Sequence, residues 1–332
     1  MQFIQPERSV KISRNIIIGD CRDVLPTLPA GHFHTCVTSP PYFGLRDYGV
    51  DGQIGLEPTP DEFVAELVKV FREVRRALRD DGTVWLNLGD SYAGGGGFSP
   101  DAPSNKAGAK QTTHKGSIRG TIKPGGVVKP KDLIGIPWRV AFALQADGWY
   151  LRQDIIWAKP NPMPESVTDR CTKAHEYIFL LSKSQRYYFD AKAIAEPAAY
   201  PGDLGILRGV SGVGEKDGVA WHAPSIATRQ AAGVDSRTAG KETRNRRSVW
   251  TVATQPFSQA HFATFPPALI EPCILAGCPA GGNVLDPFGG AGTTGLVADR
   301  LQRNATLIEL NPEYAEMADA RIYDDAPLLA EM

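Results

Sequence analysis

A short polar and aromatic motif, Ser39-Pro40-Pro41-Tyr42, directly follows the β-rich run at residues 35–38. Its two prolines fix φ and remove two N–H donors, so the turn is rigid and offers carbonyl acceptors. Beside a flat tyrosine ring, such acceptors suit a planar amine, because they hold the amine hydrogens while the ring stacks. Hydrogen bonds that draw the amine toward tetrahedral geometry localise its lone pair for attack on an electrophilic methyl group. The alternative is a simple Pro-Pro turn with a capping tyrosine.

A strand pattern, a glycine-rich turn and a helix start follow one another from Asn283 to Gly295. The glycines let backbone N–H groups approach a ligand, and a helix N-terminus attracts an anion. The spacing Gly290-x-Gly292-x-x-Gly295 also matches the dinucleotide fingerprint. Glu309, at the end of the next expected strand, is well placed for ribose hydroxyls. The motif predicts a site for adenosine with an anionic group. Alone, it leaves open a nicotinamide enzyme or a turn without ligand.

Alternating strand and helix patterns must position these two motifs. Thr59-Pro60-Asp61-Glu62 predicts a capped helix start, and the residues that follow carry an apolar stripe of helical period, namely Phe63, Leu67, Val70, Phe71, Val74 and Leu78. Strands are expected at 15–18, 35–38, 83–88, 150–157, 176–181 paired with 186–189, 283–285 and 305–309, and further helices at 138–146, 267–275, 293–301 and 313–321. This alternation predicts an α/β sandwich around a mostly parallel sheet.

The composition is that of a globular protein. The chain has 332 residues, above the ~250–300 at which one core stops growing, so a large core with a smaller lobe or long insertions is expected. Hydrophobic residues make up 42% and charged residues 22%, which excludes a disordered chain. The net charge of -1 means that any polyanion site must be a local patch. Five cysteines without paired spacing argue against a disulfide framework and a zinc site.

Two glycine-rich tracts interrupt the alternation, one at about 93–131 and one at about 200–247. Neither shows apolar periodicity, so both are expected to be long loops or weakly structured insertions. Loops of this length are usually functional or mobile. The N-terminus shows no export signal, and no uncharged apolar stretch reaches the ~20 residues that a bilayer needs, so a soluble protein is expected.

Six segments in this order resemble the motifs of S-adenosylmethionine-dependent amino-group DNA methyltransferases, in the arrangement in which the catalytic motif comes first. Ser39-Pro40-Pro41-Tyr42 resembles the catalytic motif [DNS]-P-P-[YF], residues 286–294 resemble the cofactor loop, and Glu309 resembles the ribose ligand. Residues 19–25 are similar to the early cofactor motif and residues 86–92 to the strand-end motif beside the catalytic pocket. The segment at 261–266 is similar to the one that packs around the methionine arm of the cofactor.

The resemblance implies site residues and a fold. The implied catalytic set is Ser39, Pro40, Pro41, Tyr42 and Asp90. The implied set for S-adenosylmethionine, in which Asp20 meets the adenine amine, is Asp20, Cys21, Phe265, Asp286, Phe288, Gly289, Gly290, Gly292, Thr293, Thr294 and Glu309. No metal is implied. The implied fold is the three-layer, Rossmann-like α/β methyltransferase fold, with a mostly parallel seven-stranded sheet that contains a reversed hairpin and carries an inserted DNA-recognition region.

The same resemblance suggests the domains and partners. Residues 1–190 and 250–332 are expected to form the catalytic domain, with a flexible basic loop at about 93–131, and residues 191–249 a target-recognition insertion. Double-stranded DNA is the expected partner, contacted by basic side chains of the two tracts: Lys106, Lys110, Lys115, Arg119, Arg229, Arg244, Arg246 and Arg247. A solvated charged loop is the alternative. A homodimer, a cognate restriction endonuclease and a cytoplasmic, prokaryotic or phage-encoded protein without membrane contact are compatible with the family.

Several alternatives stay open. Serine at position 39 favours cytosine N4 over adenine N6, but a hydroxyl accepts from either amine. Some relatives carry an acid at the position of Asn87, and here the acid is Asp90, so either residue could face the pocket. Cytosine C5 methylation would need a thiolate, and Pro272-Cys273 lies in an expected helix where core packing explains it better. An RNA or protein-glutamine methyltransferase and a catalytically dead DNA-binding regulator are the more distant alternatives.

Overall fold

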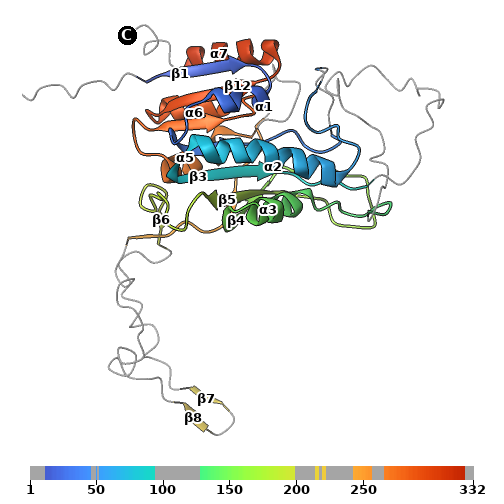
Figure 1. Cartoon of the computed structure of the whole chain (residues 1–332). Helices are drawn as coiled ribbons and strands as arrows, with labels where there is room; N and C mark the ends of the chain where they lie inside the picture. Colours follow the sequence, from blue (N-terminus) through green and yellow to red (C-terminus); the bar gives the residue numbers. More distant parts are fainter. Residues whose placement is uncertain are drawn as a thin grey trace, which may run out of the picture. The chain divides into compact units, whose positions relative to one another are not determined.

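A computed structural model describes residues 12–45, 50, 52–93, 128–198, 214–216, 219–221, 242–255 and 265–325. The chain divides into two compact units, residues 1–190 with 248–332 and residues 191–247. The larger unit holds all of the strands and helices that position the two motifs (Figure 1). Among the described residues, no helix is long and apolar enough to cross a membrane.

The larger unit is built on one eight-stranded sheet in the order β1-β12-β11-β2-β3-β5-β4-β10. The strands are β1 (Arg14–Ile18), β2 (Phe33–Thr38), β3 (Leu78–Leu88), β4 (Tyr150–Ala158), β5 (His175–Ser182), β10 (Val249–Thr251), β11 (Asn283–Asp286) and β12 (Asn304–Glu309). Only β5 runs antiparallel to its neighbours β3 and β4. The prediction of a mostly parallel sheet is therefore confirmed, and β4 with the antiparallel β5 forms the reversed hairpin expected in it.

The sheet has one strand more than the seven that were expected. The additional strand is β10, which pairs in parallel with β4 through Trp250 and Trp157. Both tryptophan side chains are buried, so this short strand is fixed to the sheet by apolar packing as well as by its ladder. The boundary of the larger unit consequently lies before Ser248, slightly earlier than the expected residue 250.

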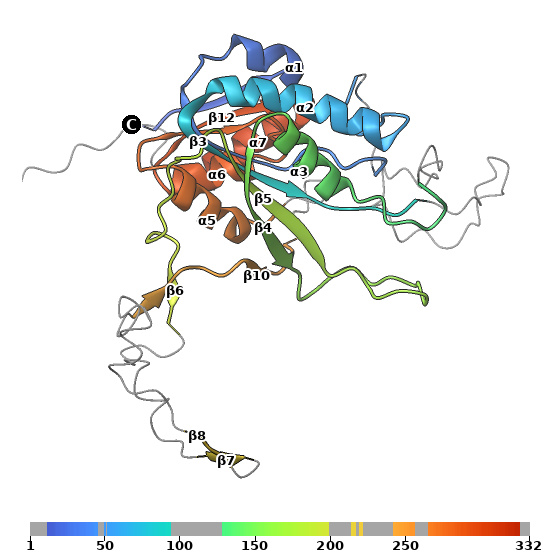
Figure 2. The same cartoon turned by 60° about the horizontal axis from the view of Figure 1, so that its bottom comes forward.

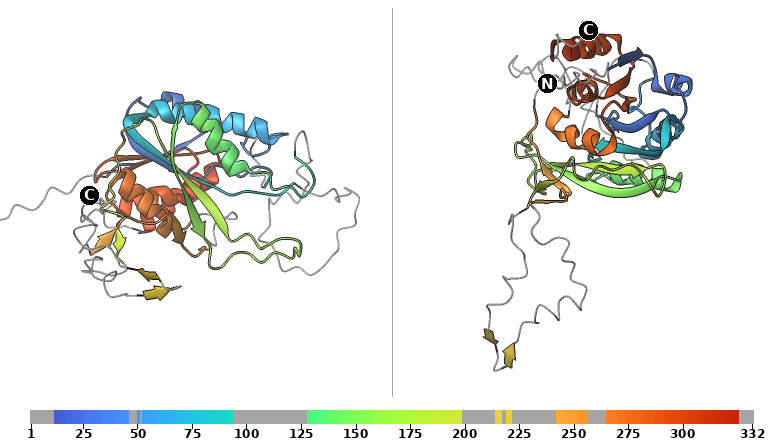
Figure 3. Two further views of the ribbon diagram at one scale, coloured as in Figure 1. Left: turned by 90° about the horizontal axis from the view of Figure 1, so that it is seen from below. Right: turned by 90° about the vertical axis from the view of Figure 1, so that its left-hand side faces the viewer.

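Helices cover both faces of the sheet, as the two views in Figure 3 show, with α2 and α3 on one face and α5 and α6 on the other. In the described part of the larger unit the α-helices are α1 (Cys21–Val24), α2 (Pro60–Ala77), α3 (Ile136–Ala146), α5 (Pro267–Gly277), α6 (Thr293–Arg300) and α7 (Pro312–Asp325). Helix α2 begins with the expected capping box, in which the Glu62 amide donates to Thr59 Oγ1 at 3.2 Å and the Thr59 amide donates to Glu62 Oε2 at 3.1 Å. Its apolar stripe is buried.

The predicted pairing of residues 176–181 with 186–189 is wrong. Strand β5 lies between β3 and β4, so both of its edges are already paired, and residues 186–189 form no strand. That segment instead contacts the start of β3, where the Tyr188 amide donates to the Asp81 carbonyl at 2.9 Å. The ring of Phe189 stacks on buried Trp85 with 6.1 Å between ring centroids. Figure 2 shows β4 and β5 side by side.

In its described residues, the smaller unit (191–247) contains two short antiparallel strand pairs. Strand β6 (Glu196–Pro197) pairs with β9 (Thr243–Arg244), and β7 (Gly214–Lys216) pairs with β8 (Val219–Trp221). The bounds of this unit lie near those of the insertion expected at 191–249, whose role in target recognition stays a prediction. The other glycine-rich tract lies mostly outside the described residues, but its two ends are joined by a bridge between Tyr92 and Leu133.

Candidate active site

The carboxyl ends of four parallel strands meet at one edge of the sheet. Ile18 is in register with Glu309, Asp286 with Leu307, and Leu285 with Cys36. The residues that follow these strands are therefore neighbours, although β2 and β11 are far apart in the sequence. In open α/β sheets this edge is where ligands bind.

A cavity of about 880 Å³ lies at this edge. Its lining includes Gly19 to Cys21 after β1, Ser39 to Tyr42 after β2, Pro287 to Ala291 after β11, and Glu309 to Asn311 after β12. A volume of this size is in the range of cofactor and substrate pockets. The structure thus brings the proline motif and the glycine motif, both singled out in the sequence, into the same cavity.

Most of the implied cofactor residues line this cavity, and three lie beneath it. The lining residues are Asp20, Cys21, Phe265, Phe288, Gly289, Gly290, Thr293 and Glu309, whereas Asp286, Gly292 and Thr294 are absent from the lining. Asp286 is 1% exposed and accepts hydrogen bonds from Thr38 Oγ1 and Thr294 Oγ1, both at 2.6 Å. Asp286 therefore ties β2 to the start of α6 and shapes the glycine loop without facing the cavity.

Two carboxylates, Asp20 after β1 and Glu309 at the end of β12, line the cavity. Glu309 accepts from the Gly290 amide at 2.7 Å and from the Asn311 amide at 2.9 Å. Burial raises the pKa of Glu309 above its ordinary value of 4.5. Burial alone would also raise the pKa of Asp20, but hydrogen bonds from Arg22 hold it below 3.8. Both side chains can accept from hydroxyl or amine groups of a ligand, as an adenosine moiety requires.

Thiol chemistry finds no support in the cysteines near the site. Cys21 lines the cavity, but burial raises the pKa of its thiol to about 12. Cys273 is 0% exposed inside α5, where its Sγ lies 3.8 Å from the Leu269 carbonyl oxygen. Cys273 is therefore a core side chain, which fits packing better than the accessible, activated thiolate that C5 methylation needs.

The proline turn at residues 39–42 is held by three kinds of contact. Phe43, which follows Tyr42, is buried and packs against Phe63 of α2 with 5.5 Å between ring centroids. The Tyr42 hydroxyl donates to Glu176 Oε2 at 2.7 Å. A Cβ atom at Gly89 would lie only 2.5 Å from Tyr42 Cε2, so glycine is required there for the ring to approach the backbone after β3. These contacts fix the orientation of the aromatic face.

Glu176 and Lys159 are cavity residues that sequence reasoning missed. Glu176 is the second residue of β5, and Lys159 directly follows β4. The two form an ion pair, and Asn87 Nδ2 also donates to Glu176 Oε2 at 3.3 Å. Lys159 Nζ lies 4.2 Å from the centroid of the Trp157 ring. The sequence signal that could have found them is an acid at the start of the apolar strand β5 and a base directly after the apolar end of β4.

Asn87, and not Asp90, lines the cavity. The Asp90 carboxylate accepts from the amides of Gly135 and Ile136 at 3.0 and 3.1 Å, at the start of α3. Its backbone carbonyl accepts from Lys173 Nζ at 2.9 Å. Asp90 therefore caps α3, whose N-cap residue Gly135 has no side chain to do so. This placement differs from the catalytic one expected for Asp90.

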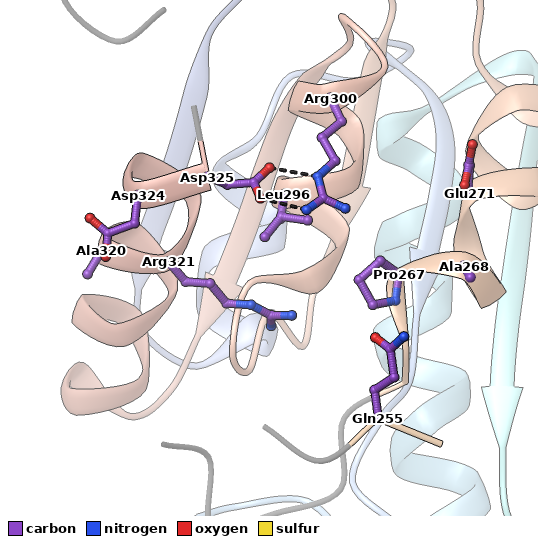
Figure 4. A pocket seen from close by; sticks show the side chains of 10 residues that line it. All are labelled: Gln255, Pro267, Ala268, Glu271, Leu296, Arg300, Ala320, Arg321, Asp324 and Asp325. Atoms are coloured by element: carbon purple, nitrogen blue, oxygen red, sulfur yellow. Dashed lines mark hydrogen bonds and ion pairs between the residues drawn. The ribbon is translucent and has the colours of Figure 1, made fainter. Parts of the chain in front are cut away.

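A second cavity, of about 680 Å³, is lined by residues of α5, α6 and α7 (Figure 4). Arg321 of α7 lines it and donates through Nη1 to the Ala291 carbonyl and to Thr293 Oγ1, both at 2.9 Å. In the same cavity Arg300 pairs with Asp325. Arg321 thus braces the glycine loop at Ala291 and Thr293, which both line the main cavity.

The implied DNA contacts fall largely outside the described residues, where Lys106, Lys110, Lys115, Arg119 and Arg229 lie, as does His261. Arg244 and Arg247 are described, and both pair with Glu196 of β6, at 2.9 and 2.6 Å. Arg246 lies between them. The smaller unit therefore presents a cluster of arginines around one acid.

The chain matches proteins of known class along most of its length. The DNA methylase family model matches residues 33–320. The chain is 46% identical to the type II methyltransferase M.SmaI of Serratia marcescens over 310 residues, which are 93% of this chain and 91% of that protein. It is 47% identical to the type II methyltransferase M.Cfr9I of Citrobacter freundii over 305 residues, which are 92% and 86% of the two proteins.

A solved structure agrees on the fold. The PvuII DNA methyltransferase (cytosine-N4-specific) superposes with a TM-score of 0.59 at 18% identity, covering 96% of this chain and 93% of that one. At this identity the likeness concerns the fold alone. With a family match over most of the chain and relatives close to half identical, the chain belongs to the N6/N4 DNA methylase family, whose methyl donor is S-adenosylmethionine.

Proposed function

We propose that this DNA methyltransferase transfers the methyl group to the exocyclic amine of a base flipped out of duplex DNA, with cytosine N4 as the favoured acceptor. The observation that carries the proposal is the meeting of Ser39-Pro40-Pro41-Tyr42 and the loop at 287–291 in one cavity. When bound, S-adenosylmethionine supplies an electrophilic methyl group. The residues fit that cofactor, since Glu309 and Asp20 offer acceptors while Phe288 and Ile308 offer apolar walls.

Tyr42 provides the stacking face for the base. Its ring is held between the Glu176 carboxylate and the bare backbone of Gly89, so little conformational freedom is lost when a base stacks on it. A base stacked on an aromatic ring gains ~1–3 kcal/mol. Because a duplex encloses the amine, the base must first leave the helix to reach this ring.

Ser39 and the carbonyl groups of the proline turn are the proposed acceptors for the amine hydrogens. Ser39 is half-buried at the end of β2 and lines the cavity beside Tyr42. Acceptors at this point draw the amine nitrogen toward tetrahedral geometry, which directs its lone pair at the methyl group. The proton is lost after the attack, so a strongly basic residue is unnecessary.

Serine at position 39 is the basis for favouring cytosine over adenine. In this family the aspartate form of the motif is typical of adenine N6 enzymes, and the serine form of cytosine N4 enzymes. Adenine N6 is the second candidate, because the Ser39 hydroxyl accepts from either amine.

We further propose that residues 191–247 and the glycine-rich tract after Tyr92 contact the DNA. Arg244, Arg246 and Arg247 can donate to phosphates or to guanine edges. A homodimer on a palindromic site and a cognate restriction endonuclease belong to the same proposal, since the relatives are type II methyltransferases.

The identity of the methylated base tests the proposal directly. Duplex DNA treated with the protein and S-adenosylmethionine should yield 4-methylcytosine in nucleoside mass spectrometry, and the Tyr42→Ala variant should yield little of it. Methylation-sensitive sequencing of the same DNA would give the recognition site. A 6-methyladenine product would overturn the base assignment alone, whereas methylation of RNA or protein but not DNA would overturn the function.

A further inference from the structure

Met163 combines two properties that rarely occur together. It is 77% exposed, more than any other large hydrophobic side chain that the structure describes. It also lines the cavity that contains Tyr42. An exposed hydrophobic residue alone needs no explanation, but one at the entrance of an active site stands where the substrate must pass.

The segment that carries Met163 is rigidly mounted. Prolines at 160, 162 and 164 restrict φ on both sides of it. Before Met163, Asn161 exchanges two hydrogen bonds with the backbone of Thr254, at 3.0 and 3.3 Å. The position of the side chain is therefore defined by the β4–β5 connection and by the segment that follows β10.

The other side of this segment is also anchored. Glu165 forms an ion pair with Arg170, and the Arg170 guanidinium lies 3.8 Å from the centroid of the Tyr92 ring. The Lys159 amide donates to the Ala174 carbonyl at 2.8 Å and closes the base of the connection. Because these contacts fix the backbone on both sides of Met163, its exposed side chain can contact a partner without displacement of the segment.

Leu45 is the other exposed hydrophobic side chain in the described part of the cavity lining, at 43% exposure. It follows Gly44, whose φ is 62°, and lacks the flanking prolines. Its mounting is therefore less rigid than that of Met163.

Resting on the proposed function, we propose that Met163 is the wedge that enters the base stack where the target base has left it. Apolar side chains, methionine among them, unstack base steps by inserting between them. A thioether also makes favourable contacts with aromatic rings. With Met163 in the gap, return of the base into the helix is blocked while its amine lies at Ser39 and Tyr42.

Single-turnover methylation of two duplexes of one sequence tests the wedge. In one the target base is paired, and in the other it faces an abasic site, where no partner has to be broken. Met163→Ala should lower the rate on the paired duplex by about tenfold, the effect of losing one unstacking contact. On the abasic duplex the rate should stay within about twofold, because flipping is already easy.

Two variants complete the design. Met163→Leu keeps the apolar bulk and should retain the wild-type rate on both duplexes. Val167→Ala removes an exposed side chain of the same connection that does not line the cavity, and should also leave both rates unchanged. Calorimetry should show the same affinity for S-adenosylmethionine in all variants.

Equal rates for wild type and Met163→Ala on the paired duplex would overturn the wedge, and so would an equal fall on both duplexes, which would place Met163 in the methylation step. Wild-type protein that methylates neither duplex would instead contradict the proposed function, on which the wedge rests.

Discussion

Glu309 shows how one side chain can fix a loop and still offer hydrogen-bond acceptors to a ligand. Its two carboxylate oxygens accept from the Gly290 and Asn311 amides, so it fixes the turn after β11 and the start of α7. Each carboxylate oxygen has a second lone pair that stays available to a ligand. The acidity of this group therefore bears on cofactor binding.

Binding of S-adenosylmethionine should weaken on acidification. Because burial raises the pKa of Glu309 above 4.5, protonation begins at a higher pH than for an ordinary glutamate and removes the charged acceptor as pH falls. Below that pKa the affinity should drop by up to about tenfold per pH unit. Calorimetric titrations from neutral pH downward should show this decline.

The matched variants locate the effect. Glu309→Gln should bind more weakly at neutral pH and lose the decline, whereas Glu313→Gln, which alters an exposed glutamate of α7, should behave like wild type. A decline of unchanged size in Glu309→Gln would assign the pH dependence to another group.

At the residue scale, local motifs were predicted and the contacts between distant segments were not. The proline and glycine motifs carry their chemistry in consecutive residues. Glu176 and Lys159 acquire theirs only because β5 is reversed and lies next to β4, which places the start of one strand beside the end of the other. Likewise, the sequence leaves open whether Asn87 or Asp90 faces the pocket, because the role of Asp90 as a cap depends on where α3 begins.

At the scale of elements, that cap joins the end of β3 to α3 across the first glycine-rich tract. Gly135 has a φ of 78° and contributes no capping side chain, so the amides at the start of α3 rely on Asp90. A carboxylate at a helix N-terminus also interacts favourably with the helix dipole.

Asp90→Ala should therefore reduce stability more than activity. The free energy of unfolding should fall by about 0.5–2 kcal/mol, the usual cost of losing a cap. Denaturant unfolding measures this loss, and Asp90→Asn, which keeps an acceptor oxygen, should recover part of it. Asn87→Ala is the contrast, with a larger fall in methylation rate per folded molecule because Asn87 lines the cavity.

Should Asp90→Ala unfold like wild type but lose methylation, the carboxylate would belong to the reaction.

Elements with a strong local signal, such as the capped helix α2, were predictable from sequence. Strand partners were harder to predict from sequence, because both β4 and residues 186–189 were candidates to pair with β5. In the structure β4 pairs with β5, and residues 186–189 are placed by the stacking of Phe189 on Trp85.

At the scale of the whole molecule, a net charge of -1 leaves DNA affinity to local clusters. In the smaller unit, Arg244 and Arg247 share the single carboxylate of Glu196. If these arginines contact DNA as proposed, phosphates would compete with this acid for the guanidinium groups, and Glu196 would weaken DNA binding.

Glu196→Gln should consequently tighten binding to duplex DNA at low salt. Each additional phosphate contact should steepen the dependence of log affinity on log salt by about 0.9. Fluorescence anisotropy across a salt series measures both quantities. Glu242→Gln removes one negative charge from an exposed position of the same unit and should change affinity much less. Identical affinities for the two variants would show that these arginines do not contact phosphates.

The strand order has a further consequence, for synthesis of the chain on the ribosome. Strand β1 pairs with β12, and β2 pairs with β11. Both partners are translated after every other strand of the sheet. Until residues 283–309 have emerged, the two amino-terminal strands expose unpaired parallel edges, which are aggregation-prone. Pairing over such separations is also slow. A transcript cut short before Glu309 would therefore encode a substrate for chaperones and proteases rather than a partly active methylase.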